Sequence, residues 1–419
     1  MQADRKNKPT CFDWIQLLLT FCVPVAIVVY TILENNRDLA ISTQHRNQDL
    51  SIADGQQQDT VLREYKKTLS RLVEKHGLFF NYSSSASLIA RSSTTVALNQ
   101  IDPARRKFLL SLLYDAKLIT YDLPTDPSVI SLDYANFTDI CLFIKFINPV
   151  YIHLNVEGAI MIRADFRNVT LHGAKFNKAI LHYADFSFSN NVKFYDVLGF
   201  DGSNDITLFF RNSDITSAKF LHVKYERVSF EHALLRNADM KSFACVSCNF
   251  SFSFMGRTNL INAVIEDSLM DFVDLSDSNL YRSRFGENID FHSTILFRVN
   301  GTYTSFTHCQ FTLTAFGSAI FDYTKMEDST FFNANFIEAS IQYGVFTRAN
   351  FTQANLFASD WRNVRCEKCI FYRANFTDAN LLNAIFIDSD FQDVFITKEQ
   401  LRQTASLKGS ILPNGTLVN

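Results

Sequence analysis

A five-residue pattern runs from Ile289 to Ile396 without losing its register. Phenylalanine fills more than half of the central positions of these pentads. The position two residues before the centre is Ala, Gly, Ser, Thr, Cys or Val everywhere except at Ile289. A second block keeps the pattern in another frame from Ala218 to Phe285. With 41 Phe but only 13 Gly and 7 Pro, the composition indicates one repeated core built on a preferred residue.

The clearest copies of the pattern are Ala334-Asn335-Phe336, Ala349-Asn350-Phe351, Ala354-Asn355-Leu356, Ala374-Asn375-Phe376 and Ala379-Asn380-Leu381. They resemble the pentapeptide-repeat family, whose motif is a small residue, Asp or Asn, Leu or Phe, and two variable positions. The resemblance implies a mainly β fold over residues 123–396. That fold is a right-handed quadrilateral β-helix, a pentapeptide-repeat solenoid with four pentads to a coil.

Physical geometry supports such a coil. If each side is one short pentad, the large central residue and the small residue two positions earlier can both point inward. Residues twenty apart then stack at ~4.8 Å, the spacing of neighbouring strands. Stacked rings would fill the interior, so we expect no ligand channel inside the repeats. One column is phenylalanine at every step: Phe291, Phe311, Phe331, Phe351, Phe371 and Phe391.

Residues 14–33 contain no charged side chain, and an α-helix of this length crosses the ~30 Å hydrocarbon core of a bilayer. A cleaved signal peptide would have a shorter apolar region and a small-residue cleavage site. We therefore predict an uncleaved, single-pass transmembrane helix. Basic residues are concentrated in the preceding tail, residues 1–13, and only Arg37 follows closely. The positive-inside rule then predicts a cytoplasmic N-terminus and extracellular or lumenal repeats.

The N-terminal portion also resembles membrane-anchored members of the pentapeptide-repeat family. In those proteins a tryptophan-led span, here beginning at Trp14, precedes a Gln-rich helix, here from Ile52 to Tyr65. The resemblance implies that the protein is tethered to a membrane. It implies no biochemical activity.

Residues 34–122 are predicted to form a helical connector. A second helix is expected over 87–98, and a third begins at Asp102-Pro103, a cap followed by proline at the first helical position. The stripe on the first helix can pack within the protein or form a coiled-coil-like dimer contact. The side chains at helical spacing that make this stripe are Val61, Leu62, Tyr65, Leu69, Leu72, Val73 and His76.

Residues 397–419 are predicted to form a C-terminal cap, because a solenoid needs its ends covered. Thr397 and Gln400 have the spacing of a capping box that opens a terminal helix. Either this cap or the helical connector is a candidate contact for a homodimer.

Two C-x-x-C pairs, Cys245 with Cys248 and Cys366 with Cys369, fall on inward positions of the pattern. Six coils separate the pairs, about 29 Å at the strand spacing, which is too far for one tetrahedral zinc. Two interpretations stay open, namely small buried side chains or a disulfide within each pair. We expect no metal and no cofactor.

Eight N-x-S/T sequons all lie on the side of the span that is predicted to be exported, where they are candidates for N-glycosylation. Several belong to A-N-F-T copies of the repeat and would recur for structural reasons alone. The sequons begin at Asn81, Asn136, Asn168, Asn249, Asn300, Asn350, Asn375 and Asn414.

Nothing in the sequence indicates catalysis. It has no G-x-S-x-G, P-loop or H-E-x-x-H motif, and no Asp or Glu occupies an inward position of the long block. We expect no catalytic residue and no enzyme. A catalytic or regulatory accessory protein would need a polar pocket where the pattern breaks, at Asn148–Pro149, Gly199–Ala218 or Gly286–Ile289.

A second alternative is an acidic DNA mimic that inhibits a nucleic-acid enzyme, as some pentapeptide-repeat proteins do. The chain has 43 acidic and 40 basic side chains and a net charge of −3, which does not favour a mimic or a nucleic-acid partner. The favoured function is a membrane-tethered scaffold that binds an unknown protein. An outward column with Phe297, Ile337 and Phe357 is one candidate contact.

Overall fold

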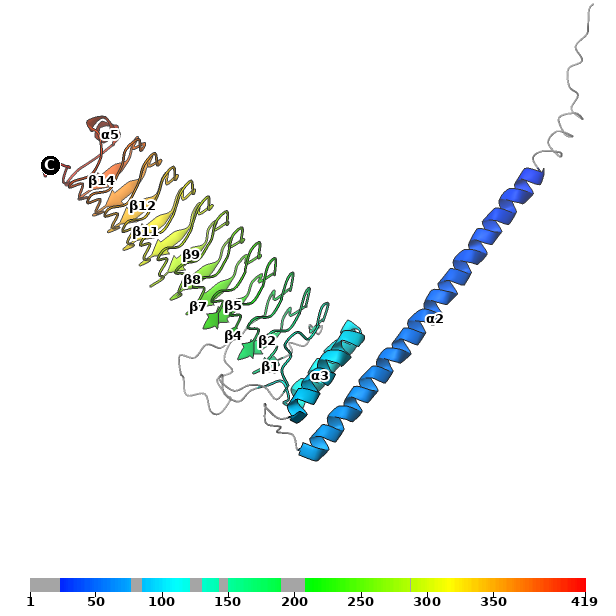
Figure 1. Ribbon diagram of the computed structural model, residues 1–419. Helices are drawn as coiled ribbons and strands as arrows, with labels where there is room; N and C mark the ends of the chain where they lie inside the picture. The colour runs from blue at the N-terminus through cyan, green and yellow to red at the C-terminus, as the bar shows by residue number, and fades with distance from the viewer. Residues whose placement is uncertain (1–22, 77–84, 121–129, 143–149, 190–207, 287) are drawn as a thin grey trace, which may run out of the picture. The chain divides into compact units, whose positions relative to one another are not determined.

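The computed structural model describes the chain except for residues 1–22, 77–84, 121–129, 143–149, 190–207 and 287. The chain forms two compact units, Met1–Glu64 and Tyr65–Asn419. Helix α2 (Val23–His76) contributes to both, and α3 (Ser85–Gln100) and α4 (Pro103–Asp115) belong to the second (Figure 1).

The predicted membrane span, residues 14–33, lies only partly in the described part of the chain. Residues 1–22 are not described, and only the helical backbone is described for residues 23–32. Among the helices that the structure does describe, none combines the length and the apolar character needed to span a bilayer.

The end of α2 packs through the stripe that its sequence predicts. Tyr65, Leu69 and Leu72 are buried, and the Tyr65 hydroxyl lies 2.9 Å from the Thr94 hydroxyl of α3. Burial raises the pKa of Tyr65 to about 12, and its hydrogen bond with Thr94 opposes this shift. This stripe therefore packs within the second unit.

Helix α4 begins where the sequence predicts. Asp102 is its N-cap and accepts a hydrogen bond from the backbone N–H of Arg105, with Pro103 at the first helical position. The guanidinium of Arg106 donates to the carbonyl oxygens of Leu98 and Thr138. Because Thr138 lies in the first coil of the repeats, Arg106 joins the helices to the solenoid.

The repeats form a parallel β-solenoid of about 11 turns (Figure 1). Strand partners lie twenty residues apart, for example Phe346 opposite Cys366, and the step is twenty-one between Phe285 and Phe306. The single extra residue falls at the predicted break Gly286–Ile289. The strands are β1 (Val150–Ile152), β2 (Thr170–His172), β3 (Ala174–Lys175), β4 (Leu208–Phe209), β5 (Lys224–Glu226), β6 (Val228–Ser229), β7 (Ala244–Val246), β8 (Val264–Glu266), β9 (Arg284–Gly286), β10 (Ser305–Thr307), β11 (Lys325–Glu327), β12 (Val345–Thr347), β13 (Arg365–Glu367) and β14 (Ile385–Ile387).

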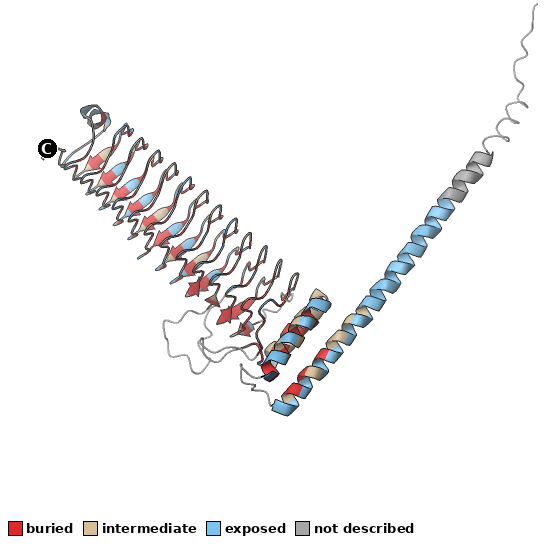
Figure 2. Cartoon of the chain, in the orientation of Figure 1, coloured by how far each residue is buried: buried red, intermediate tan, exposed pale blue. Residues whose placement is uncertain are grey.

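Small and central positions point inward, as the pattern predicts (Figure 2). The rings of Phe311 and Phe331 are parallel within 2°, with centroids 4.9 Å apart. Gly301 is an exception at a central position. A Cβ atom there would lie 2.1 Å from the Phe321 ring of the next coil, so glycine makes room for that ring. The core is therefore a continuous stack of side chains.

Each pentad turns through a residue in the left-handed region. Ser293 has a φ of 53°, and the N–H of Thr294 then donates to the carbonyl of Phe291 at 3.1 Å. This arrangement resembles a type II turn, which usually takes glycine at that position. Here the residue is seldom glycine, because each turn is stabilised by hydrogen bonds to the coils above and below. This explains how so regular a chain contains so few glycines.

Asn or Asp before the central residue stabilises these turns. The Oδ1 atom of Asn350 accepts hydrogen bonds from the backbone N–H and the hydroxyl of Thr352, at 2.9 and 2.6 Å. Asp290 accepts the N–H of His292 at 2.8 Å in the same way. The preference for Asn and Asp therefore comes from local side-chain capping of a turn.

The C-terminal residues close the last coil in two parts. Thr397 and Gln400 form the predicted capping box of α5 (Lys398–Gln403). The Gln400 side chain also donates to the carbonyls of Phe376 and Ala379, at 2.6 and 2.9 Å. The chain then returns to the solenoid, where Ile411 bridges Asp390, and ends in a short antiparallel pair with Leu417.

Candidate interaction surfaces

Outward side chains also stack in columns, because each coil repeats the one before. The most apolar group, called here the aromatic patch, consists of His232, Leu234, Phe252, Phe254 and Phe272. Ring centroids are 4.9 Å apart from His232 to Phe252 and from Phe252 to Phe272. Phe252, Phe254 and Phe272 are 40, 44 and 47% exposed. Such contiguous exposed apolar surface commonly marks a protein interaction site.

A second group, called here the tyrosine ladder, occupies another corner. The rings of Tyr303, Tyr323 and Tyr343 are stacked with centroids 4.9 and 4.8 Å apart. Because the ring faces contact one another, the ladder presents ring edges and hydroxyls to solvent. Burial, and then the neighbouring Tyr343 and Tyr303, raise the pKa of Tyr323. Tyr323 therefore stays uncharged at neutral pH.

The column predicted as a contact is less continuous. Phe297 and Phe357 are 39 and 36% exposed, and Ile337 is only partly exposed. Gly317 lies between Phe297 and Ile337 and adds no side chain to the column; a Cβ atom there would lie 3.3 Å from the Phe297 ring. The aromatic patch lies in the earlier block, in another frame, and its residues share no motif. Only the column spacing of twenty could have revealed it.

One column of charges at a corner of the coil alternates in sign, from Arg257 through Asp277 to Arg298. Asp277 accepts hydrogen bonds from the Arg298 guanidinium at 2.6 and 3.0 Å, and Arg257 lies 3.8 Å away on its other side. The hydrogen bond from Arg298 is the main reason why the pKa of Asp277 is lowered. Asp328 pairs with Arg348 in the same manner. A surface with paired charges does not present the continuous negative potential that DNA mimicry requires.

The two C-x-x-C pairs occupy equivalent places on the same side of the coil. Cys245 and Cys248 are joined by a disulfide with Cα atoms 6.1 Å apart. Cys366 and Cys369 are buried free thiols, and burial raises the pKa of Cys366. Of the two interpretations left open by the sequence, the structure thus has a disulfide at Cys245–Cys248 and small buried side chains at Cys366 and Cys369. The backbone N–H of Cys248 donates a hydrogen bond to the hydroxyl of Ser268 in the next coil, and the N–H of Cys369 donates to that of Ser389.

The sequons differ in exposure. Asn81 lies outside the described residues. Five repeat sequons are partly buried and use the Asn oxygen to cap the following turn, beginning at Asn136, Asn249, Asn300, Asn350 and Asn375. Asn168 is also partly buried, whereas Asn414 in the C-terminal hairpin is exposed. The recurrence of these sequons thus has a structural reason.

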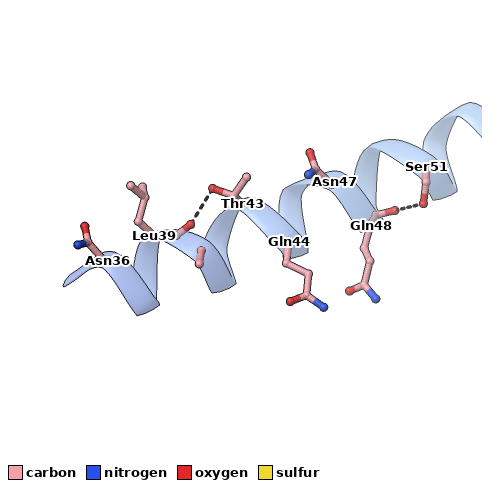
Figure 3. A pocket seen from close by; sticks show the side chains of 8 residues that line it. Asn36, Leu39, Thr43, Gln44, Asn47, Gln48 and Ser51 are labelled. Carbon is pink, nitrogen blue, oxygen red and sulfur yellow. Dashed lines mark hydrogen bonds between the residues drawn. The ribbon is translucent and has the colours of Figure 1, made fainter. Parts of the chain in front are cut away.

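The predicted breaks, the possible metal ligands and one hollow bear on catalysis. Each predicted break contains residues that the structure does not describe, namely 143–149, 190–207 and 287. Within the described part, no cluster of three or more His, Cys, Asp or Glu side chains could hold a metal. A shallow hollow follows α2 from Asn36 to Ser51, but it is lined by one helix surface only (Figure 3). One open helix surface does not converge polar groups on a substrate.

Comparison with known proteins supports the repeat. The family model described as pentapeptide repeats matches eight copies, within residues 154–190, 329–356 and 359–397. No curated protein matches the sequence.

Solved structures similar to the chain include two pentapeptide repeat proteins and one fluoroquinolone resistance protein. HetL, involved in heterocyst differentiation regulation in the cyanobacterium Nostoc sp. strain PCC 7120, is 17% identical; the match covers 68% of this chain and 91% of HetL, with a TM-score of 0.24. QnrB1, a plasmid-mediated fluoroquinolone resistance protein, is 14% identical over 49% of this chain and 92% of its own, with a TM-score of 0.23. A pentapeptide repeat protein of the Arabidopsis thaliana thylakoid lumen is 23% identical. The match covers 28% of this chain and 66% of that protein, with a TM-score of 0.13. The family model matches three segments of the chain, and the five-residue geometry of the solenoid continues between them.

Proposed function

We propose that the protein is a membrane-tethered scaffold that binds a protein partner through the aromatic patch, on the non-cytoplasmic side of the membrane. The observation that carries this proposal is the contrast between the two kinds of column. Inward columns such as that of Phe331 are fully buried, whereas Phe252, Phe254 and Phe272 remain at least 40% exposed. Exposed rings that stabilise no core are suited to a partner.

A scaffold fits the interior better than an enzyme does. Central positions such as Phe351 and Trp361 are completely buried, and each ring stacks on the next. Pentapeptide-repeat proteins are generally non-catalytic structural or interaction proteins. An accessory role for a catalytic partner is compatible with binding through the patch, and a homodimer through the helical connector or the cap remains part of the proposal.

The membrane tether is supported by the sequence alone. Residues 14–33 are uncharged and long enough to span a bilayer. The basic residues before them favour export of everything that follows. Surface sequons, foremost the exposed Asn414, would then be available for glycosylation.

The patch is tested by affinity purification with the full chain as bait. Replacing Phe252 and Phe272 by serine should abolish recovery of a partner that the wild type retains. Replacing Tyr323 and Tyr343 by serine is the matched control, since these rings are similarly exposed and also stacked. Loss of the partner with both variants, or with neither, would reject the patch as the binding surface.

The tether is tested by topology. Protease added outside intact cells, or to the lumenal side of opened vesicles, should remove the repeats and leave a short membrane-bound fragment. A chain that lacks residues 14–33 should be released from the membrane fraction. Repeats that stay protected from external and lumenal protease, on a chain without any glycan, would contradict the proposed orientation.

A further inference from the structure

The side of the solenoid formed by the nine-stranded sheet has an ordered charge pattern. From β5 to β14, each strand of this sheet buries its middle residue, and the two outer residues face outward except in β9, where Gly286 is also buried. The outer residues form two columns, and each column carries charge of one sign only. The first column contains Lys224, Arg284, Lys325 and Arg365. The second contains Glu226, Glu266, Glu327 and Glu367.

At the remaining positions of the two columns, the outer residues are apolar or neutral. Val246, Val264 and Val345 are 37 to 39% exposed, although each belongs to a regular strand. The charged and apolar levels are flat and regularly spaced, at ~4.8 Å from strand to strand. A partner that matches them must repeat at the same distance.

A second copy of the same side satisfies this condition in one orientation. If a two-fold axis runs parallel to the solenoid axis, the first column of one copy faces the second column of the other at each level. Lys325 then lies opposite Glu327 of the second copy, and Glu327 opposite its Lys325. Such an interface is isologous: both copies use the same surface, and each pair of opposite charges occurs twice.

The antiparallel orientation does not work. With the two-fold axis along the strands, each column faces itself, so that basic side chains can meet only basic or neutral ones. In the parallel orientation no level opposes like charges. Glu266 would face Val264, but it is already paired with Arg284 at 2.7 Å.

We propose that two copies of this chain associate in parallel through the nine-stranded side. Lys325 is suited to the contact because it makes no ion pair with any described residue of its own chain, whereas Glu327 is already paired with Arg348 at 2.8 Å and would have to share its charge. Nine strands at ~4.8 Å and three residues of ~3.3 Å cover about 400 Å² in each copy. A total below about 1,000 Å² is typical of weak, reversible association. The pairing needs no membrane anchor, but it leaves the amino-terminal ends of both solenoids on the same side.

Charge reversal tests the contact on the full chain, purified in a mild detergent and studied by sedimentation velocity. Lys325→Glu or Glu327→Lys alone should weaken self-association at least tenfold, because like charges then face each other. The double variant should recover to within about threefold of the wild type. Lys241→Glu, an exposed lysine outside this sheet, is the control and should have no effect. Melting temperatures establish that every variant is folded.

Orientation is tested by mixing two variants, Val345→Cys and Thr347→Cys, each made in a chain whose exposed Cys141 is replaced by serine. The parallel pairing places these positions opposite each other on two facing sheets about 10 Å apart, so a short bismaleimide reagent should join 345 to 347 in the mixture and should join neither variant to itself. Wild-type chain that remains monomeric at high micromolar concentration would overturn the proposal. The proposal would also be overturned if both single charge variants associated as strongly as the wild type, or if the double variant associated as weakly as the single ones. Cross-links that form only between two copies of the same variant would overturn it as well.

Discussion

The ring of Phe351 lies parallel to the ring of Phe331, within 7° and with centroids 4.5 Å apart. These residues are twenty positions apart, which is one coil of the solenoid. The same relationship holds between Phe351 and Phe371, at 5.2 Å. A single column therefore determines both the register between coils and the filling of the interior.

The capping of each turn by Asn or Asp makes a first prediction. Replacing Asn375 by Ala should destabilise the protein by about 1 kcal/mol, because the N–H and hydroxyl of Thr377 lose their common acceptor. Replacing Asn375 by Asp keeps that acceptor and should cost less. The midpoint of thermal unfolding distinguishes the two. Equal losses would mean that the oxygen does not stabilise the turn.

The cysteines make a second prediction, because they differ in burial. An alkylating reagent should modify the exposed Cys141 in the folded protein. Cys366 and Cys369 should react only after unfolding, since burial raises the pKa of Cys366 and the thiolate is the reactive form. Cys245 and Cys248 should need reduction as well. Peptide mass spectrometry measures each site; rapid labelling of folded Cys366, or a Cys245–Cys366 link, would contradict this account.

The Asp328–Arg348 pair makes a third prediction, on pH. The hydrogen bond from Arg348 holds the pKa of Asp328 below its ordinary value of 3.8. The pair therefore stabilises the folded state at neutral pH, and this stabilisation is lost as the pH falls below 3.8 through the lower folded-state pKa. The side chains of Arg348 and Asp328 are 49 and 27% exposed, so solvent screens the pair, and the effect should be small and weakened by salt.

Asp328→Asn provides the measurement, since Asn also tolerates the left-handed conformation of this residue, φ 51°. At pH 7 and low salt the variant should melt slightly below the wild type, and at pH 2.5 the two should converge. A difference that grows on acidification would show that the sign is wrong.

Much of the solenoid could be predicted, because its period is short and each pentad repeats the same physical requirement. Phe291 and Phe311 are inward in the structure for the reason that the sequence suggests, namely a large residue at every centre. The capping box at Thr397 and the N-cap at Asp102 were also predictable, since both depend on neighbouring residues alone.

The surfaces were harder to predict for a physical reason. Outward positions accept many residues, so a column such as Phe252–Phe272 produces no motif in the linear sequence. Whether a C-x-x-C pair is bridged also escapes the pattern, because Cys245 and Cys366 occupy equivalent positions yet differ in the structure. Membrane insertion depends on residues 14–33, which the structure describes only in part and without side chains before Leu33.

The most direct test of the five-residue frame compares two adjacent phenylalanines. Phe331 is fully buried between the rings of Phe311 and Phe351, whereas Phe332 is 40% exposed. Phe331→Ala should cost about 3–5 kcal/mol of unfolding free energy, because it leaves a cavity in the stack. Phe332→Ala should cost at most about 0.5 kcal/mol, as is usual at the surface. Denaturant unfolding of the two variants measures both values; equal losses, or a larger loss at Phe332, would contradict the frame and with it the solenoid.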